Sequence, residues 1–435
     1  MKRWLALAVA VAAVAATALA PRLTQAQAPA PAPTAGSKVG SGLINPRGFK
    51  MGADGMLYIA EAGNGGTTDF TAPDGSKMLN GFSGRISKMD PATGARTTVA
   101  DKLPSNASPP DPESGEPGDS VGPADVAFIG DQLYYVQTHG GADWGFPDTP
   151  TGVYNVKSDG TTELIADIGA FNKANPVTPI KNGTQQDIEP GGNPYSMIAR
   201  GNSFYVSDGN QNQVMKVDLD GTITRIADFP THIVTTGIAG GETGPLYVST
   251  LGAFPFLPED GRVYQVGVPS GNLTELARGQ QFLSAVAIGN GGQLYALQLI
   301  KLDEATQAPV LGTGTIFKVN ADGTMTPLVT GFTGATAMII VNDTAYVADF
   351  GVFGDGTIWK VPALSQVAAL PVAPPPSPTA AAPTATPRTG ISAPDTGSGG
   401  VDGDAARTSP LALAILGAAA LMLMAAAAGV RMKRR

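Results

Sequence analysis

Short apolar runs alternate with polar turns along the middle of the chain, and one tripeptide recurs in this pattern. It consists of an apolar or small residue, then Tyr, then a second and mostly apolar residue, directly after a tight polar turn. The six copies are Leu57-Tyr58-Ile59, Leu133-Tyr134-Tyr135, Phe204-Tyr205-Val206, Leu246-Tyr247-Val248, Leu294-Tyr295-Ala296 and Ala345-Tyr346-Val347. The tyrosines lie 42 to 76 residues apart, by subtraction of their numbers. The shortest step matches one four-stranded propeller blade of ~40–50 residues, and we interpret the longer steps as the same unit with inserted loops.

Each copy belongs to a unit that reads as four short strands. The strands are rich in β-branched and aromatic residues and are bounded by Gly, Asp and Asn. Between the last two strands of three units lie the turns Asp159-Gly160, Asp220-Gly221 and Asp322-Gly323. Asp-Gly tolerates the positive φ angles of a two-residue hairpin. The pattern therefore predicts an all-β protein, a six-bladed β-propeller over residues 37–363.

The sixth unit lacks a fourth strand of its own. After Trp359-Lys360-Val361 the sequence passes into a Pro-rich stretch, whereas Ser37 to Leu43 forms a spare strand ahead of the first unit. One blade shared between both ends of the chain closes the ring and removes an exposed sheet edge. We therefore expect the strand near Val39 to pair with the strand near Ile358.

The N-terminal residues have the pattern of a secretion signal. Lys2 and Arg3 precede an unbroken run of apolar or small residues from Trp4 to Ala20. This pattern predicts a signal peptide at residues 1–26. The alternative is an uncleaved membrane anchor, and cleavage is preferred because Pro/Ala-rich sequence follows at once.

A second apolar segment, Leu411 to Val430, precedes a basic tail at residues 431–435. Its 20 residues span ~30 Å as a helix, the hydrocarbon thickness of a bilayer. Cationic flanks stay in the cytoplasm, so we expect a transmembrane segment with the rest of the chain on the extracellular face of the membrane or in the cell wall. Residues 364–392, rich in Pro, Ala and Thr, then form an extended stalk.

Residues 393–410 resemble a sortase sorting signal. Ala393-Pro394-Asp395-Thr396-Gly397 follows the Pro-x-Thr-Gly pattern, with Ala393 where the usual motif has Leu, and an apolar span and a basic tail come next. The resemblance implies that a transpeptidase cuts between Thr396 and Gly397 and joins the protein to the cell wall. The alternative is a plain single-pass anchor, and both routes attach the protein to the cell surface.

The absence of cysteine and the negative net charge restrict the kinds of anchor and binding partner that this chain can have. The chain has no cysteine, so an exported form relies on its own core and a lipoprotein anchor is excluded. The net charge is −8, and the signal and tail together hold seven basic residues and no acid, which leaves −15 on the exported part. That charge disfavours nucleic acid and anionic lipid as partners.

Four segments resemble the secreted ScyD/ScyE family of NHL-type propellers. They are Leu43 to Phe49 with its Asn-Pro-Arg-Gly opening, Ala53 to Glu61, Gly122 to Val126 and Asn193 to Ser196. The resemblance covers about Lys38 to Val361. It implies a propeller fold and export, and it implies no chemistry.

Insertions fall only at certain positions of the repeat. They lie between the second and third strands or between one unit and the next: Ala62 to Gly84, Leu103 to Val121, Thr138 to Thr151, Gly169 to Gly192, Leu251 to Gly261 and Leu299 to Gly314. Antiparallel geometry places all of these at one end of the ring, the loop face, and the tight turns at the other, the turn face. Binding usually resides on such loops, although surface loops also tolerate insertion without a function.

Polar residues are expected at the loop-face mouth of the ring. Three residues beyond each Tyr come Glu61, Gln137, Asp208, Thr250, Gln298 and Asp349, and the innermost strands begin near Arg47, Asp125, Tyr195, Thr236, Ser284 and Thr336. From these we predict a binding rim of Arg47, Glu61, Asp125, Tyr195, Asp208 and Asp349. Glu61, Asp208 and Asp349 are also candidate ligands for calcium. The alternative is that these acids cap turns by accepting backbone N–H bonds.

Catalytic motifs are missing from the sequence. The two histidines, His139 and His232, lie in predicted loops, and there is no Cys nucleophile, Gly-x-Ser-x-Gly elbow, His-Glu-x-x-His or phosphate-binding Gly loop. Trp144 and Phe146 either face a ligand or pin their own loop. The first hypothesis is therefore a surface-displayed, non-catalytic binding or scaffold propeller for an extracellular small molecule, glycan or protein. The alternative, by analogy with six-bladed gluconolactonases, is a metal-dependent hydrolase or lactonase.

Overall fold

Antiparallel strands make up most of the chain that the computed structural model describes. The described residues are 32–72, 75–110, 119–177, 191–231, 233–252, 256–257, 259–303, 308–352 and 354–371. They form six sheets of four or more strands and one sheet of two, which confirms the expectation of an all-β chain. The signal peptide, most of the stalk, the sortase-like segment, the apolar segment and the basic tail lie outside these residues. Among the residues described, no helix has the length and apolar character to cross a membrane.

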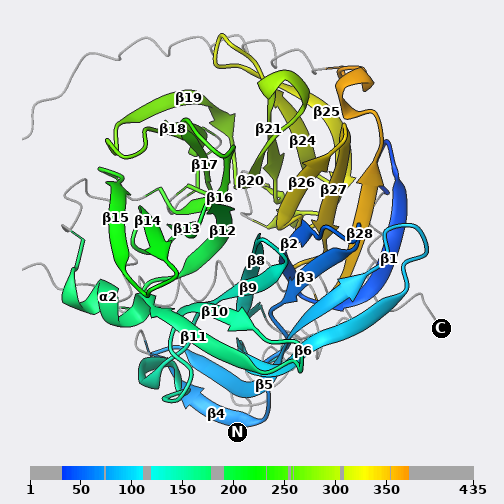
Figure 1. The fold of residues 1–435 in the computed structure, drawn as a ribbon. Helices are drawn as coiled ribbons and strands as arrows, with labels where there is room; N and C mark the ends of the chain where they lie inside the picture. Colours follow the sequence, from blue (N-terminus) through cyan, green and yellow to red (C-terminus); the bar gives the residue numbers. More distant parts are fainter. Residues whose placement is uncertain are drawn as a thin grey trace, which may run out of the picture. The chain divides into compact units, whose positions relative to one another are not determined.

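The sheets follow one another along the chain. The first large sheet contains β2 (Pro46–Met51), β3 (Leu57–Glu61), β5 (Lys77–Met89), β6 (Arg96–Ala107) and β7 (Ser120–Val121), with β4 (Thr68–Thr71) paired to β5; the second contains β8 (Pro123–Ile129), β9 (Gln132–Gln137), β10 (Gly152–Val156) and β11 (Thr162–Asp167). The third contains β12 (Pro194–Arg200), β13 (Ser203–Asp208), β14 (Gln213–Asp218) and β15 (Ile223–Asp228), and the fourth contains β16 (Thr235–Gly240), β17 (Leu246–Thr250), β18 (Gly261–Val266) and β19 (Leu273–Gln280). The fifth contains β20 (Leu283–Ile288), β21 (Leu294–Gln298), β24 (Gly314–Val319) and β25 (Met325–Phe332), and the last contains β26 (Ala337–Val341), β27 (Thr344–Asp349), β28 (Asp355–Val361) and β1 (Ser37–Ile44). The small sheet is β22 (Lys301–Leu302) with β23 (Pro309–Val310), and one α-helix, α2 (Ile168–Ala174), follows β11. Figure 1 shows β2, β8, β12, β16, β20 and β26, one strand from each large sheet, around a common centre. The sheets are thus arranged as the blades of a β-propeller.

The repeated tripeptide is buried where neighbouring sheets pack on one another. Phe204 and Val206 of β13 contact Val136 and Val153 of the preceding sheet in one apolar cluster. Burying one such side chain contributes about 1.5–3 kcal/mol. The apolar positions of the tripeptide therefore specify which face of each sheet meets the next sheet.

The Asp-Gly turns occur where they were expected, but each loop is one residue longer. Lys157 donates its N–H to Thr161 O, so the loop at Asp159-Gly160 has three residues. Gly160 has a φ of 84°, and the Asp159 carboxylate accepts the Thr161 N–H at 2.9 Å. The prediction of a two-residue hairpin was wrong because the pattern Asp-Gly-Thr also suits a three-residue loop with Gly in the left-handed position.

The first strand of the chain pairs with the last, as predicted. Lys38 lies opposite Trp359 and Gly40 opposite Ile358 in the antiparallel pair β1–β28. The N-terminal strand therefore completes the sheet that the C-terminal strands begin.

Three buried hydroxyl groups join successive inner strands, and we call Thr236, Ser284 and Thr336 the hydroxyl belt. Each hydroxyl donates to a backbone carbonyl at the start of the next sheet: those of Leu283, Ala335 and Pro46, at 2.7, 2.6 and 2.6 Å. The last of these bonds joins residues 290 positions apart. The belt therefore connects the last sheet to the first.

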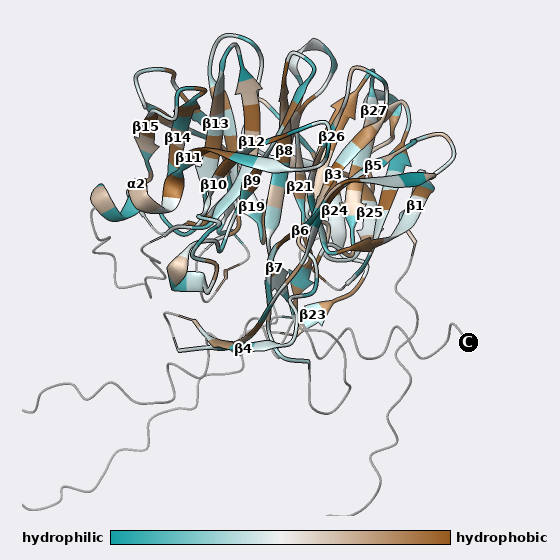
Figure 2. Cartoon of the chain, turned by 60° about the horizontal axis from the view of Figure 1, so that its bottom comes forward, coloured by the Kyte–Doolittle hydropathy of each residue, from teal (hydrophilic) through white to brown (hydrophobic). Residues whose placement is uncertain are grey.

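The two ends of the sheets differ, as the insertion pattern predicted. Figure 2 shows β4, β7 and β23 beyond one end of the sheets, while tight turns close the other end. The chain leaves the last sheet on the turn face, because Leu364 donates its N–H to Asp343 O in the β26–β27 turn. Leu370 then donates to Pro327 O near the beginning of β25.

Candidate functional site

The three acids proposed as metal ligands each bond the backbone that leads into their own sheet. Glu61 accepts the Ile44 N–H at 2.6 Å, Asp208 the Asn193 N–H at 2.8 Å and Asp349 the Thr333 N–H at 2.7 Å. The first two also accept side-chain donors, Ser87 and Asn172 respectively. All three carboxylates are buried. They satisfy amides at the entrance to an inner strand, which confirms the interpretation as turn caps.

Glutamine performs the complementary task at the same repeat position. The Gln137 side-chain amide donates to Thr138 O, and that of Gln298 donates to Gln281 O, both at 2.8 Å. Where an acid accepts a backbone N–H, the glutamine donates to a carbonyl. The polar side chains at this position therefore bond to the backbone of their own chain.

The predicted calcium site of Glu61, Asp208 and Asp349 is not assembled. The three acids lie in different sheets, and the described residues contain no group of three His, Cys, Asp or Glu side chains placed to hold a metal ion. The prediction was wrong because the three acids occupy the same position in three separate sheets and do not come together at one point. Each carboxylate also accepts hydrogen bonds from donors of its own.

Burial changes the protonation of two of these acids. It raises the pKa of Asp208 above the ordinary value and raises the pKa of Asp349 to about 7. Backbone bonds from Thr333 and Phe350 oppose the rise at Asp349. A carboxyl group that titrates near neutrality inside a sheet makes stability depend on pH.

The beginnings of the inner strands meet at the centre of the ring, as predicted. Arg47, Asp125, Tyr195, Ser284 and Thr336 line one cavity of about 190 Å³. Arg47 and Tyr195 also line a second cavity of about 240 Å³, together with Thr236. Of the predicted rim, Arg47, Asp125 and Tyr195 are thus brought together, whereas Glu61, Asp208 and Asp349 are set back inside their sheets.

Tyr195 borders both cavities. Its hydroxyl crosses the centre and donates to Thr336 O at 3.1 Å, joining β12 to the segment before β26. Removal from water raises the pKa of Tyr195 to about 12, so the phenol stays protonated and remains a donor. Tyr195 and Arg47 both line the two cavities, so the cavities meet at these two side chains.

The cavity on the loop face, which we call the loop-side cup, has polar walls with an apolar patch. It is lined by Arg47, Asp119, Thr138, Asn193, Tyr195 and Thr236 and by the apolar Val121, Val234 and Leu251, among others. Arg47 pairs with Asp119 at 2.7 Å, and Thr138 donates to the Asn193 side-chain oxygen at 3.1 Å. The Asp119 side chain is 33% exposed, so a ligand can reach this ion pair.

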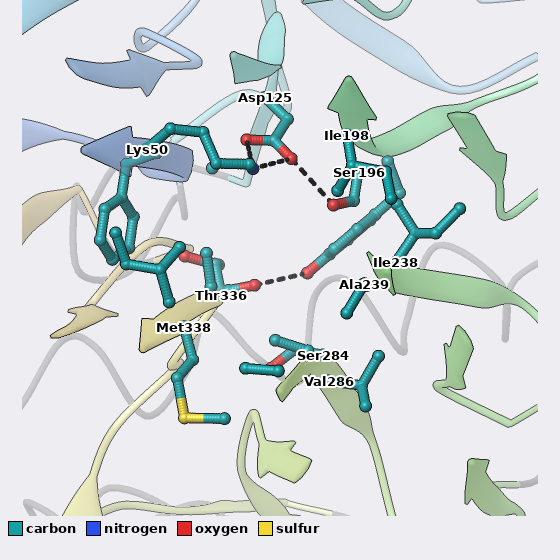
Figure 3. Close-up of a pocket in the computed structure, with 18 of the residues that line it drawn as sticks. Lys50, Asp125, Ser196, Ile198, Ile238, Ala239, Ser284, Val286, Thr336 and Met338 are labelled. Carbon is teal, nitrogen blue, oxygen red and sulfur yellow. Dashed lines mark hydrogen bonds and ion pairs between the residues drawn. The ribbon is translucent and has the colours of Figure 1, made fainter. Parts of the chain in front are cut away.

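The cavity toward the turn face, which we call the turn-side funnel, contains at its inner end an ion pair between a partly exposed lysine and a buried carboxylate. Lys50 Nζ lies 2.8 Å from both oxygens of Asp125, and Figure 3 shows this pair beside Ser196. Asp125 also accepts the Ser196 hydroxyl at 2.8 Å and the Met197 N–H at 2.9 Å. The carboxylate therefore joins β2, β8 and β12. A Cβ at Gly48 would collide with this carboxylate, so the glycine makes the close approach possible.

The aromatic loop after β9 packs on the β4–β5 hairpin and on its own His139. Trp144 and Phe146 are buried in a cluster with Ala72 and Met78, and the His139 ring stacks on Trp144 with 3.5 Å between the ring centroids. The interpretation that these aromatics pin their own loop is confirmed. His232 lies outside the described residues.

The comparisons with known proteins concern the fold. No family model matches the chain, and no curated protein matches it. Among solved structures, it resembles a chain of a nidogen/laminin complex at 14% identity and a TM-score of 0.40, over 63% of this chain and 86% of that one. It resembles a catalytically inactive virginiamycin B lyase from Staphylococcus aureus at 13% identity and 0.38, over 75% and 98%. It also resembles a gluconolactonase from Xanthomonas campestris at 12% and 0.39, over 75% and 98%. Identities and scores this low carry no conclusion about activity, and the ScyD/ScyE resemblance stays a prediction.

Proposed function

We propose that this protein is a non-catalytic binding module that holds one sugar unit of an extracellular glycan in the loop-side cup. The observation that carries the proposal is the relation between the two faces. The cup opens on the loop face, whereas the chain leaves the ring on the turn face, near Asp343 and Pro327. A stalk and anchor that follow residue 371 would attach the protein by its turn face and present the cup outward.

The chemistry of the cup supports a carbohydrate. A sugar ring has a polar edge of hydroxyl groups and apolar C–H faces. The cup offers polar side chains for the edge and apolar side chains for the faces. Arg47 and Asp119 supply a donor and an acceptor, and Val234 and Leu251 supply an apolar wall. Mostly apolar pockets with a few placed polar groups are typical of small-molecule sites.

A rigid scaffold supports the same role. We infer that the six large sheets are the six blades of one closed propeller, fastened by β1 and by the hydroxyl belt. Such a ring holds loop-borne groups in fixed positions, which reduces the ordering cost of binding.

The argument on which the hydrolase alternative rested no longer supports it. It rested on carboxylates around a central metal, and the three candidates cap separate strand entrances. Asp125, which lines the turn-side funnel, has Lys50 as its counter-ion.

A glycan array probed with the purified full chain tests the proposal. Two variants change the cup: Asp119→Asn removes the negative charge and replaces one acceptor oxygen by an NH2 donor, and Val121→Trp fills the space. We expect each to weaken glycan binding at least tenfold, which corresponds to about 1.4 kcal/mol.

Matched controls lie on the turn face. Asp54→Asn and Leu219→Trp make the same chemical changes at exposed positions and are expected to bind like the wild type. Binding of no glycan, or binding that the cup variants leave unchanged, refutes the proposal. Retention of a free small molecule or a protein instead would replace the glycan as ligand.

A further inference from the structure

The turn-side funnel is a second cavity that the proposed function does not use. Its inner end is polar, with Lys50, Asp125 and Ser196, and its outer part is apolar. The apolar lining includes Ile198, Ile238, Val286, Ile288, Met338 and Ile340. Figure 3 shows these two parts, with the ion pair on one side and Ile238, Val286 and Met338 on the other.

The apolar residues form the mouth. Gly240, Ile288 and Ile340 come directly before, or one residue before, the tight turns that close the inner hairpins. Ile198, Ile288 and Ile340 are only partly buried, so apolar surface of this concave mouth meets water. Contact with an apolar ligand would remove that surface from water.

The inner end can recognise one polar group. The Lys50 ammonium has three N–H groups, and its two contacts with Asp125 occupy at most two of them. The hydroxyls of Ser284 and Thr336 already donate to carbonyl oxygens. The Lys50 ammonium therefore keeps an N–H group for a ligand, and this donor selects a hydrogen-bond acceptor.

We propose that the turn-side funnel binds a small amphiphile, head first. A carboxylate or carbonyl oxygen accepts from Lys50, and a short apolar body lies against the isoleucines and Met338 at the mouth. The polar and apolar groups named here belong to the funnel and not to the cup, so we expect the two sites to be occupied separately.

The absence of cysteine from the chain allows a test at a single atom. Ile340→Cys places one thiol at the mouth, and its rate of reaction with a maleimide in the full chain is measured with and without hexanoate. Leu164→Cys is the matched control, because Leu164 is an exposed apolar residue of an outer strand. We expect hexanoate to slow labelling of the first variant and to leave that of the second unchanged.

Chain length and head group identify what is recognised. Each methylene that enters the funnel should tighten binding about fourfold, from ~0.8 kcal/mol per buried CH₂, so butanoate, pentanoate and hexanoate should protect at successively lower concentrations. Hexanamide has the carbonyl oxygen of hexanoate without its negative charge. Equal protection by the two compounds indicates that the site recognises a carbonyl oxygen, and protection by hexanoate alone indicates that it recognises the charge. Lys50→Met combined with Ile340→Cys should abolish the preference for either head over hexane-1-ol, and Lys88→Met, at an exposed ion pair, is its control.

Several results would overturn the proposal. Equal labelling rates with and without hexanoate would do so, as would protection that does not depend on chain length. Labelling that slows as the protein concentration rises would show instead that a second copy covers the mouth. If Lys50→Met does not fold, the chain-length series decides alone. Val121→Trp in the cup should leave protection unchanged, so failure of the glycan proposal and failure of this one can be told apart.

Discussion

Replacing Thr336 with Val should weaken the whole ring, because Thr336 closes the hydroxyl belt between the last sheet and the first. Its hydroxyl donates to Pro46 O at 2.6 Å, and the side chain is fully buried. Val has nearly the same shape, so the substitution leaves no cavity and removes only the donor. A buried carbonyl left without its partner costs about 1–3 kcal/mol.

The corresponding change in melting temperature follows from the size of the ring. Unfolding entropy of ~2.1 cal/mol/K per residue over about 335 residues gives roughly 0.7 kcal/mol/K. A loss of about 1–3 kcal/mol then lowers the melting temperature by about 1.5–4 °C. The shift is small, so the free energy from denaturant titration is the better measure.

Guanidinium titration of the full chain measures the loss directly, provided that the slope of the transition is unchanged. Thr97→Val is the control, because Thr97 is exposed on an outer strand. Thr236→Val should cost about the same as Thr336→Val, since it removes the equivalent bond to Leu283 O at 2.7 Å. A surface substitution changes the free energy of unfolding by about 0.5 kcal/mol or less. If the free energies of unfolding of Thr336→Val and Thr97→Val differ by less than this amount, the belt does not hold the ring closed.

Three other outcomes are expected. The Asp349 carboxyl has a pKa near 3.8 in the unfolded chain and about 7 in the folded chain. Its contribution to the free energy of unfolding is therefore complete below about pH 4 and is lost as the pH rises through 7. That contribution amounts to ~4 kcal/mol, from ~1.4 kcal/mol per pKa unit. Asp349→Asn should flatten the profile of stability between pH 4 and 8, and an unchanged profile would contradict the assignment. Deleting Ser37 to Leu43 should destabilise the entire ring, seen as one cooperative transition at lower denaturant, whereas loss of one local phase would argue against closure by β1. Truncation at Asp404 should release the protein into the medium, and a truncated protein that stays with the cells would exclude the C-terminal anchor.

The sheets were predictable because their determinants are local. Each tripeptide and each Asp-Gly turn is a signal of two or three adjacent residues, and each constrains one hairpin. The pairing of β1 with β28 followed from counting strands, since a blade without its outer strand leaves an open edge. Within the sheets, the loop lengths at the three Asp-Gly turns were misjudged, because the same two residues suit two kinds of turn.

The roles of the rim residues could not be predicted in the same way. The sequence shows that Glu61, Asp208 and Asp349 share a repeat position, but their donors come from the segments that enter each blade, which follow no motif. Lys50 was missed although it gives a signal: a lysine inside a predicted innermost strand must find a buried counter-ion. Its partner Asp125 lies 75 residues away, and only the ring brings the two together.

Two cavities border Tyr195, so one ring can present two different sites. The phenol donates to Thr336 O at the level of the belt, where the loop-side cup and the turn-side funnel meet at Arg47 and Tyr195. The loops after the second and fourth strands vary in length and can supply polar groups to the cup. The tight turns allow no such variation, so the opposite site must be built from the inner strands themselves, whose alternation gives an apolar mouth above one ion pair. A single substitution, Tyr195→Phe, removes the bond to Thr336 while keeping the ring that fills the centre. It should therefore weaken the link between β12 and the segment before β26 and leave the chemistry of both walls intact.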